Sequence, residues 1–315
     1  MIQRADWDAE SYFQTHLPIK QELKDKKGEV FTPPALIDQV LDLFPAAVWS
    51  NPDLKWLDPC AGVGFFMIRV FQRLMTGLSR TLVDTKQRQT HILGNMLHMV
   101  ELSKANCKQC RRLFGDSAQV VCADYLSTHL EPMDCIVGNP PFQDYYGLNV
   151  TGRRITGGKN KLYERIFLHA LNQLRPGGHL AMIVPINLFG GNGSQGYQKL
   201  LENHVSFVSV NPSIESFFDR IQQPMAYFLL TKDTHTNTHT NTNTNTDKST
   251  VVEYAEDKQW QTVLKDRPVN PIRNWSPTMD KRIDQFVSRE RTQAIRYNRG
   301  WPLDWPDSDV EYAPF

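Results

Sequence analysis

Residues 54–67 read Leu-Lys-Trp-Leu-Asp-Pro-Cys-Ala-Gly-Val-Gly-Phe-Phe-Met. The apolar residues up to Leu57 predict a short buried strand, and from Phe65 onward apolar residues recur at helical spacing. Between them, Gly62 and Gly64 permit a tight strand-to-helix turn through which the backbone can approach a ligand closely. The stretch therefore predicts the first β-strand–turn–α-helix unit of an α/β sheet, with a ligand-binding loop inside it.

Strand-like runs and amphipathic helical segments alternate along the chain. The predicted strands are 54–57, 96–102, 119–123, 133–137, 179–185, 205–210 and 225–230. The predicted helices are 35–44, 65–75, 85–93, 103–114, 163–174 and 195–203. This alternation predicts a doubly wound, mostly parallel, seven-stranded α/β sheet of the Rossmann-like kind, covered on both faces. Because only a short segment joins the last two strands, we expect an antiparallel edge there.

Composition divides the chain into four parts. Residues 1–27 have a charged, helical pattern, and the sheet domain is expected to span 28–233. The Thr/Asn repeats of 234–248 cannot build a core and predict a flexible linker. Residues 249–315 predict a small basic and aromatic module, since 265–300 carry nine Lys or Arg against four acids. That excess indicates either a solvated face or a phosphate-contacting surface that helps to recognise DNA.

The overall composition excludes several classes of protein. The 315 residues carry a net charge of only +1, so any nucleic-acid surface must be local. No apolar run is long enough to span a bilayer and the N-terminus has no signal core, so we expect an intracellular protein that is not secreted. Its five scattered cysteines suggest reduced thiols. The single C-x-x-C of Cys107 and Cys110 lacks a second pair, so no metal site is expected.

The turn after the first strand limits which cofactor it binds. No Gly-Lys-Ser/Thr follows, and Met67 stands where a dinucleotide loop needs its third glycine. The remaining pattern, Asp-Pro-x-x-Gly-x-Gly, resembles motif I of S-adenosylmethionine-dependent methyltransferases. The next two strands end at Glu101 and Asp124, which we expect to meet ribose hydroxyls and an adenine amine respectively. Either acid alone could instead be a helix cap or a surface charge.

Residues 139–142, Asn-Pro-Pro-Phe, follow a predicted strand and can hold a flat molecule with an exocyclic amine. The Asn139 side-chain oxygen and the Pro140 carbonyl are acceptors, and Phe142 offers a stacking surface. Pro140 and Pro141 fix the backbone, so the carbonyls keep their direction. The alternative is an Asn-Pro turn that simply closes a strand.

With these motifs in this order, the chain resembles the N6-adenine-specific DNA methyltransferase family in its γ arrangement. Residues 28–33 (Gly-Glu-Val-Phe-Thr-Pro) resemble its motif X, and 162–167 and 176–185 resemble its motifs V and VI. The resemblance covers 28–232. It implies S-adenosylmethionine as the cofactor, the N6 amine of adenine as the acceptor, and a place in restriction–modification. The implied cofactor-binding residues are Phe31, Thr32, Pro33, Asp58, Pro59, Cys60, Gly62, Gly64, Phe65, Glu101, Asp124 and Asn139.

The resemblance also implies that the target base is flipped out of the duplex and stacked on Phe142. A ring of the last predicted strand would form the other wall. The segment 143–161 is either a lid that orders on nucleic acid or a surface loop. The expected nucleic-acid contacts are Tyr145, Arg153, Arg154, Tyr227 and Phe228.

Two other functions remain open at this stage. The substrate could be an RNA adenine or a protein glutamine, although glutamine methyltransferases lack the Phe-Thr-Pro entry segment. The chain could instead be a catalytically silent subunit that binds nucleic acid. DNA is the expected partner, and because fewer than a hundred residues follow the Thr/Asn tract, sequence recognition is expected to draw on a partner subunit.

Overall fold

The computed structural model describes residues 2, 7–19, 32–142, 161–189, 195–210, 225–234, 250–254 and 258–262. The chain divides into two compact units, Met1–Val269 and Asn270–Phe315, and every described residue belongs to the first. The basic stretch 265–300 and nearly all of the Thr/Asn tract lie outside the described residues. The roles and boundaries predicted for them therefore stay predictions.

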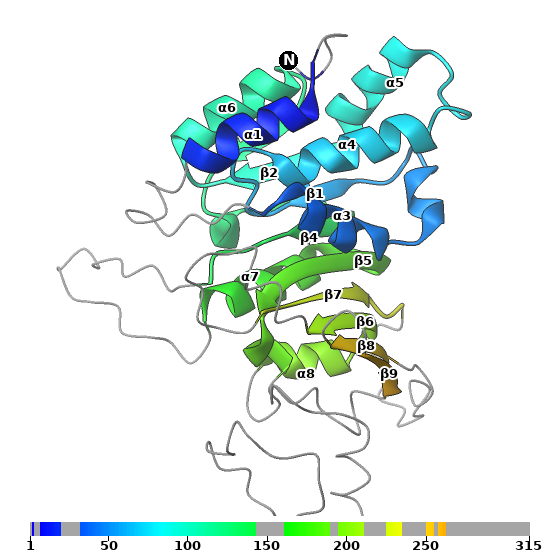
Figure 1. The fold of residues 1–315 in the computed structure, drawn as a ribbon, viewed down its shortest axis with the longest axis vertical. Coiled ribbons are helices and arrows are strands. Elements are labelled where there is room, and N and C mark those ends of the chain that lie inside the picture. The colour runs from blue at the N-terminus through cyan, green and yellow to red at the C-terminus, as the bar shows by residue number, and fades with distance from the viewer. Residues whose placement is uncertain are drawn as a thin grey trace, which may run out of the picture. The chain divides into compact units, whose positions relative to one another are not determined.

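The described strands form one sheet of nine strands in the order β3-β2-β1-β4-β5-β7-β6-β8-β9 (Figure 1). The strands are β1 (Trp56–Asp58), β2 (Leu97–Glu101), β3 (Gln119–Cys122), β4 (Met133–Gly138), β5 (Leu174–Pro185), β6 (His204–Val210), β7 (Met225–Thr231), β8 (Thr250–Tyr254) and β9 (Lys258–Thr262). Neighbours from β3 to β5 are parallel, whereas β7 runs antiparallel between β5 and β6. The chain runs outward from β1 to β3 and returns to β4 beside β1. The winding thus reverses between β1 and β4, where ligands bind in such sheets.

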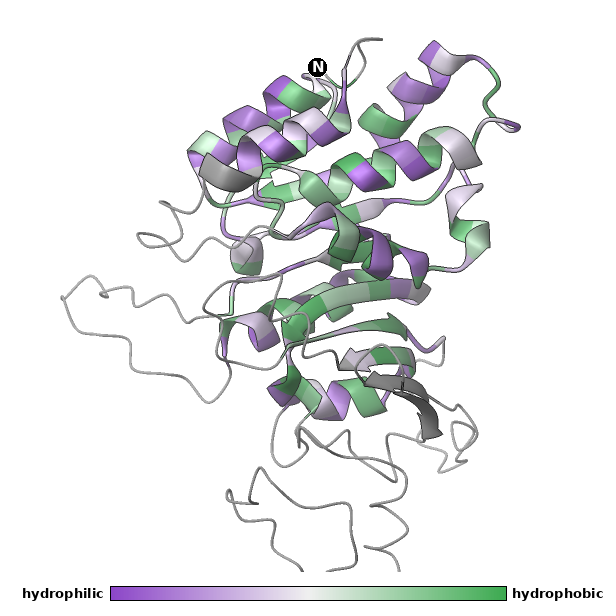
Figure 2. Cartoon of the chain, in the orientation of Figure 1, coloured by the Kyte–Doolittle hydropathy of each residue, from purple (hydrophilic) through white to green (hydrophobic). Residues whose placement is uncertain are grey.

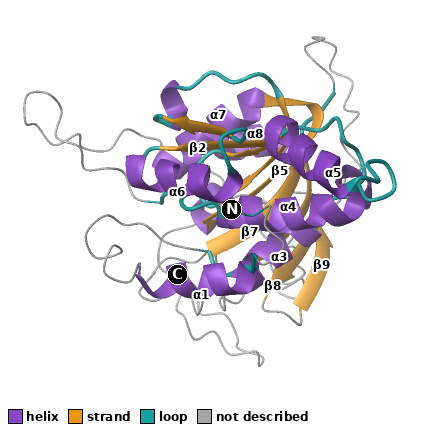
Figure 3. Ribbon diagram, turned by 90° about the horizontal axis from the view of Figure 1, so that it is seen from above, coloured by secondary structure: helices purple, strands orange, loops and turns teal. Residues whose placement is uncertain are grey.

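Helices cover both faces of this sheet. They are α1 (Ala9–Ile19), α3 (Pro34–Asp42), α4 (Phe65–Gly77), α5 (Thr85–His91), α6 (Lys104–Phe114), α7 (Leu162–Gln173) and α8 (Gln195–Leu201), with short helical turns η1 (Ala46–Trp49), η2 (Ile92–Met96), η3 (Tyr125–Ser127) and η4 (Ile186–Phe189). Strand β5 lies between α7 on one side and α3 and α4 on the other (Figure 3). Within the described part of the chain, no helix is both long and apolar enough to cross a membrane.

The core fills both sides of the central strands because their side chains alternate between the two faces. In β4, Cys135 and Val137 pack with α4, whereas Ile136 packs with α7. Figure 2 shows the result: β5 is mostly hydrophobic, whereas α5 at the periphery is mostly hydrophilic. The predicted sheet covered on both faces is confirmed.

All seven predicted strands and all six predicted helices are present, with small shifts at their ends. Strand β5 begins at Leu174 rather than His179, because Leu174 pairs with Met133 of β4, ahead of a shift in register. The expected antiparallel pairing is confirmed, but it is not at the edge. Strands β8 and β9, which the sequence analysis placed in the C-terminal module, extend the sheet beyond β6.

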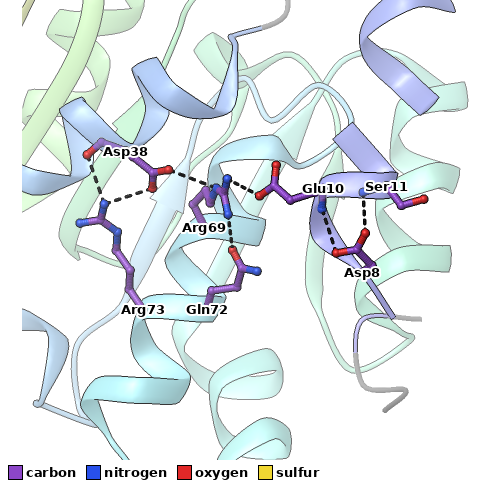
Figure 4. Close-up of polar contacts among 7 residues, drawn as sticks. All are labelled: Asp8, Glu10, Ser11, Asp38, Arg69, Gln72 and Arg73. Atoms are coloured by element: carbon purple, nitrogen blue, oxygen red, sulfur yellow. Dashed lines mark hydrogen bonds and ion pairs between the residues drawn. The ribbon is translucent and has the colours of Figure 1, made fainter. Parts of the chain in front are cut away.

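Helix α1 is attached to the sheet domain by ion pairs centred on Arg69 of α4 (Figure 4). The Arg69 guanidinium lies 2.6 Å from the Glu10 carboxylate of α1 and 3.4 Å from the Asp38 carboxylate of α3. Its central carbon also lies 4.9 Å from the centroid of the Phe13 ring. Arg73 of α4 adds a second contact to Asp38, at 3.1 Å. These pairs join the three helices that flank the predicted cofactor loop.

Substituting Arg69→Ala is expected to lower the free energy of unfolding by about 1–3 kcal/mol, because the change removes both ion pairs and the packing over Phe13. Urea denaturation measures the effect. The matched control is Lys199→Ala, since Lys199 forms an exposed pair with Glu202 just beyond the end of α8 and such pairs contribute about 0–1 kcal/mol. Equal midpoints for the two variants would show that the Arg69 cluster does not hold α1 in place.

Candidate active site

The predicted site residues gather at the carboxyl ends of four adjacent parallel strands. Asp58 ends β1 and Glu101 ends β2, while Asp124 follows β3 and Asn139 follows β4. The strand order β3-β2-β1-β4 places these ends side by side, with Asp58 and Asn139 on either side of the point where the winding reverses. The sheet thus brings together three acids and one amide that lie far apart in sequence.

The loop after β1 is shaped by its glycines. Gly62 and Gly64 have positive φ angles of 56° and 90°, a region that L side chains rarely adopt. A Cβ added to Gly64 would lie 2.6 Å from Cε2 of the buried Phe114 ring. The loop is therefore closely packed from beneath, and its backbone is the surface left to face a ligand.

Glu101 is held by backbone amides rather than left mobile. One carboxylate oxygen accepts the Gly62 N–H and the other accepts the Ser103 N–H, both at 2.7 Å. Its side chain is half-buried, and the Asn106 Nδ2 lies 3.5 Å from the oxygen that accepts the Ser103 N–H. Glu101 thereby joins the cofactor loop to the end of β2, and its predicted role toward ribose hydroxyls stays a prediction.

Asp58 is almost completely buried at the switch point. Its carboxyl oxygen Oδ1 accepts the Cys60 N–H at 3.0 Å, and a Cβ on Gly138 of β4 would lie only 2.9 Å from that oxygen. Burial is the main cause that raises the pKa of Asp58 from 3.8 to about 8; the negative charge of Glu101 raises it further, and the Cys60 hydrogen bond opposes the rise. We therefore expect the carboxyl to keep its proton in the folded protein at neutral pH.

This buried acid gives a testable dependence of stability on pH. Between pH 4 and 8 the unfolded chain has lost the Asp58 proton while the folded protein still holds it. The wild-type free energy of unfolding is thus expected to fall as pH rises through that window, relative to Asp58→Asn, and to level off above it. Urea denaturation of both proteins at pH 5, 7 and 9 measures the difference. Parallel pH profiles would contradict a buried neutral carboxyl at this position.

The side-chain oxygen of Asn139 is a buried hydrogen-bond acceptor without a partner among the described residues. Its side-chain Nδ2 donates to the hydroxyl of the buried Thr32 at 3.0 Å. Its Oδ1 is buried, and no hydrogen-bond partner for it is found among the described residues. A buried oxygen of this kind costs free energy unless a donor reaches it. Of the residues that follow, Pro140 is buried, Pro141 is exposed, and Phe142 is partly buried against the core cluster that includes α4.

The other predicted cofactor residues surround the same loop. Asp124 is exposed, and its side chain caps η3 by accepting the Leu126 N–H at 3.0 Å. Pro59 is buried, Cys60 is half-buried, and burial and three neighbouring acids raise the pKa of its thiol. Pro33, the residue after Thr32, occupies the N-cap position of α3. Phe31 lies outside the described residues. Thr32 of the entry segment contacts Asn139, and Asp58 and Pro59 lie close to the neighbouring Gly138.

The side chains of two residues near the cofactor loop are buried in the core. Phe65 is buried, with its ring 4.8 Å from that of Phe13 in α1. Cys110 is also buried, and its thiol points to the Gly62 carbonyl with an Sγ–O distance of 3.4 Å. Both residues support the loop from beneath.

The residues predicted to contact nucleic acid lie in different places in the structure. Phe228 is wholly buried between Phe167 and Phe189 on the α7 side of the sheet, so its assignment as a wall for the base is wrong. Tyr227 faces the other side, where its ring stacks on Phe207 and its hydroxyl lies 3.5 Å from Gln39 of α3. The predicted contacts Tyr145, Arg153 and Arg154 lie outside the described residues.

The sequence analysis missed the contribution of α1. The Tyr12 hydroxyl donates to the Val63 carbonyl in the cofactor loop at 3.1 Å, and burial is the main cause that raises its pKa to about 12, so it remains a donor. Gln109 of α6 donates to the same hydroxyl at 3.3 Å. A lone Tyr in a charged helical segment carries no signal that it will reach a loop some fifty residues away.

Known proteins resemble the chain in sequence and in fold. A sequence profile of the N-6 DNA methylase family matches residues 14–300. A Mycoplasma pneumoniae protein described as an uncharacterized adenine-specific methylase is 44% identical over 87 residues, 27% of this chain and 21% of the relative. The StySJI methylase subunit of a type I restriction enzyme from Salmonella typhimurium is 25% identical over 69% of this chain and 42% of the relative.

Among solved structures, the M protein of the type I restriction enzyme EcoKI superposes with a TM-score of 0.53 and 21% identity, over 72% of this chain and 48% of that one. At this identity the likeness concerns the fold alone. The chain spans less than half the length of these relatives.

The fold is that of the S-adenosylmethionine-dependent methyltransferases. The closely packed loop, whose Gly64 leaves no room for a Cβ, and the fixed Glu101 carboxylate fit that cofactor. The chain belongs to the N-6 DNA methylase family, since the family profile covers most of its length. The resemblance drawn from the motifs is thereby confirmed.

Proposed function

We propose that this chain transfers the methyl group of S-adenosylmethionine to the N6 amine of adenine in DNA. The observation that carries the proposal is the buried Oδ1 of Asn139, an acceptor without a described partner beside the cofactor loop. An exocyclic amine is the kind of donor that would satisfy it. The family to which the chain belongs supports DNA as the polymer.

Asn139 and Pro140 would accept the two N–H bonds of the amine. That arrangement favours a tetrahedral nitrogen whose lone pair is no longer delocalised into the ring. Once it has taken the methyl group the amine is positively charged and acidic, and it would release a proton to water, so no strong general base is needed. The bound cofactor would supply an electrophilic methyl group. Gly62, Gly64 and Glu101 would hold it at the carboxyl ends of β1 and β2.

The base would have to leave the duplex to reach this turn. Phe142 is half-buried, so part of its ring is accessible for stacking, which contributes about 1–3 kcal/mol per base. A DNA substrate places the activity inside the cell. We also propose a partner subunit for sequence recognition, because two relatives are named as subunits of type I restriction enzymes and this chain spans only part of them.

The test is incubation of the protein with labelled S-adenosylmethionine and separate pools of DNA, RNA and protein, followed by nucleoside and peptide mass spectrometry. N6-methyladenine in DNA alone supports the proposal. Label in RNA or on glutamine would replace it with the alternative substrates. Cofactor binding without label in any pool, with a partner subunit supplied, would indicate a silent subunit.

A further inference from the structure

Thr32 makes the one hydrogen bond described for the Asn139 side chain. The two residues are separated by 107 positions, yet the Asn139 Nδ2 lies 3.0 Å from the Thr32 hydroxyl oxygen. Thr32 is 4% exposed and directly precedes the Pro33 cap of α3. The backbone on either side is thus fixed by a helix start and by the end of β4.

The direction of this bond decides which end of the amide faces the substrate. With Nδ2 turned toward Thr32, Oδ1 is left as the buried atom without a described partner. Rotated by half a turn, the amide would present its NH2 group to an amine, and two donors would face each other. The Thr32 hydroxyl can donate as well as accept, so its contact holds the plane of the amide. In the structure it accepts from Nδ2, which leaves Oδ1 for the amine.

We infer that Thr32 is a positioning residue, which acts through Asn139 by holding its amide with the oxygen toward the target amine. The inference rests on the proposed function. It differs from the role predicted from the resemblance, in which Thr32 contacts the cofactor. The two roles separate kinetically: a positioning role affects turnover, whereas a cofactor contact affects cofactor affinity.

The experiment uses the full chain with Thr32→Val, which keeps the shape of the side chain and removes the hydroxyl. Leaving Nδ2 buried without its acceptor is expected to lower kcat about 10–100-fold. The dissociation constant for S-adenosylmethionine, measured by calorimetry, is expected to change less than about twofold. Thr32→Ser, which restores the hydroxyl, is expected to recover most of the turnover.

The matched control is Thr76→Val, which removes an exposed hydroxyl bonded to the Gln72 carbonyl on the outer surface of α4. It is expected to leave kcat and cofactor affinity unchanged. Weaker cofactor binding in Thr32→Val with unchanged kcat would overturn the inference in favour of a cofactor contact. Equal turnover in Thr32→Ser and Thr32→Val would show that the hydroxyl is not what matters.

A second measurement does not depend on turnover. In NMR spectra of the full chain, the Asn139 side-chain NH2 protons are expected to exchange slowly with water, and Thr32→Val is expected to speed that exchange. Unchanged exchange would overturn the inference even if the enzyme is active. Absence of N6-methyladenine with the wild-type protein would instead overturn the proposed function. The exchange measurement would still test the contact between Thr32 and Asn139 in that case.

Discussion

Asn139→Ala is expected to reduce methyl transfer to DNA by about 10³-fold or more, while binding of S-adenosylmethionine stays nearly intact. The variant removes the one acceptor that the structure leaves buried and without a described partner at the end of β4. Without it, the amine keeps its lone pair delocalised into the adenine ring. The loop of Gly62 and Gly64 lies on the other strand of the switch point, so the cofactor surface remains.

Single-turnover methylation and calorimetry with the cofactor measure the two effects separately. The matched control is Asn95→Ala, because Asn95 is exposed on η2 and its amide contacts only His91 among the described residues. That variant is expected to match the wild type in both measurements. Undiminished turnover in Asn139→Ala would refute the assignment of this turn as the catalytic element.

Gly64→Ala is expected to lower the free energy of unfolding by about 2–4 kcal/mol, from a strained backbone and an overpacked ring together. The backbone there has a φ of 90°, and the new Cβ would lie 2.6 Å from the buried Phe114 ring. Relief of that clash must move the loop or α6. We therefore expect cofactor affinity to fall as well, in contrast to Asn139→Ala.

Gly94 provides the comparison, because a Cβ added there meets nothing within 4 Å and its φ is not positive. Gly94→Ala is expected to leave both stability and cofactor affinity close to wild type. Urea denaturation and calorimetry on the two variants form a matched pair. If Gly64→Ala unfolds at the same urea concentration as Gly94→Ala, the loop is more compliant than its packing indicates.

Much of the sheet could be predicted because its signals are local. Apolar runs such as 133–137 are strands in the structure, and Gly62 and Gly64 do adopt the positive φ that the turn suggested. Strands β8 and β9 were missed, since they follow a low-complexity tract and short strands gain most of their stability from a neighbour. The error at Phe228 has a similar origin. In a strand buried on both faces, apolar residues are continuous and do not reveal which ones face the site.

The sequence by itself determined the order of strands and helices, the glycine turn and the chemistry of Asn139-Pro140-Pro141-Phe142, because these depend on neighbouring residues. Only the tertiary structure decided that β7 inserts between β5 and β6, that α1 supports the cofactor loop through Tyr12, and that Thr32 anchors Asn139. It also decided that burial raises the pKa of Asp58. Contacts across 107 residues and the loss of water around a carboxyl arise when distant segments pack together, and no local pattern records them.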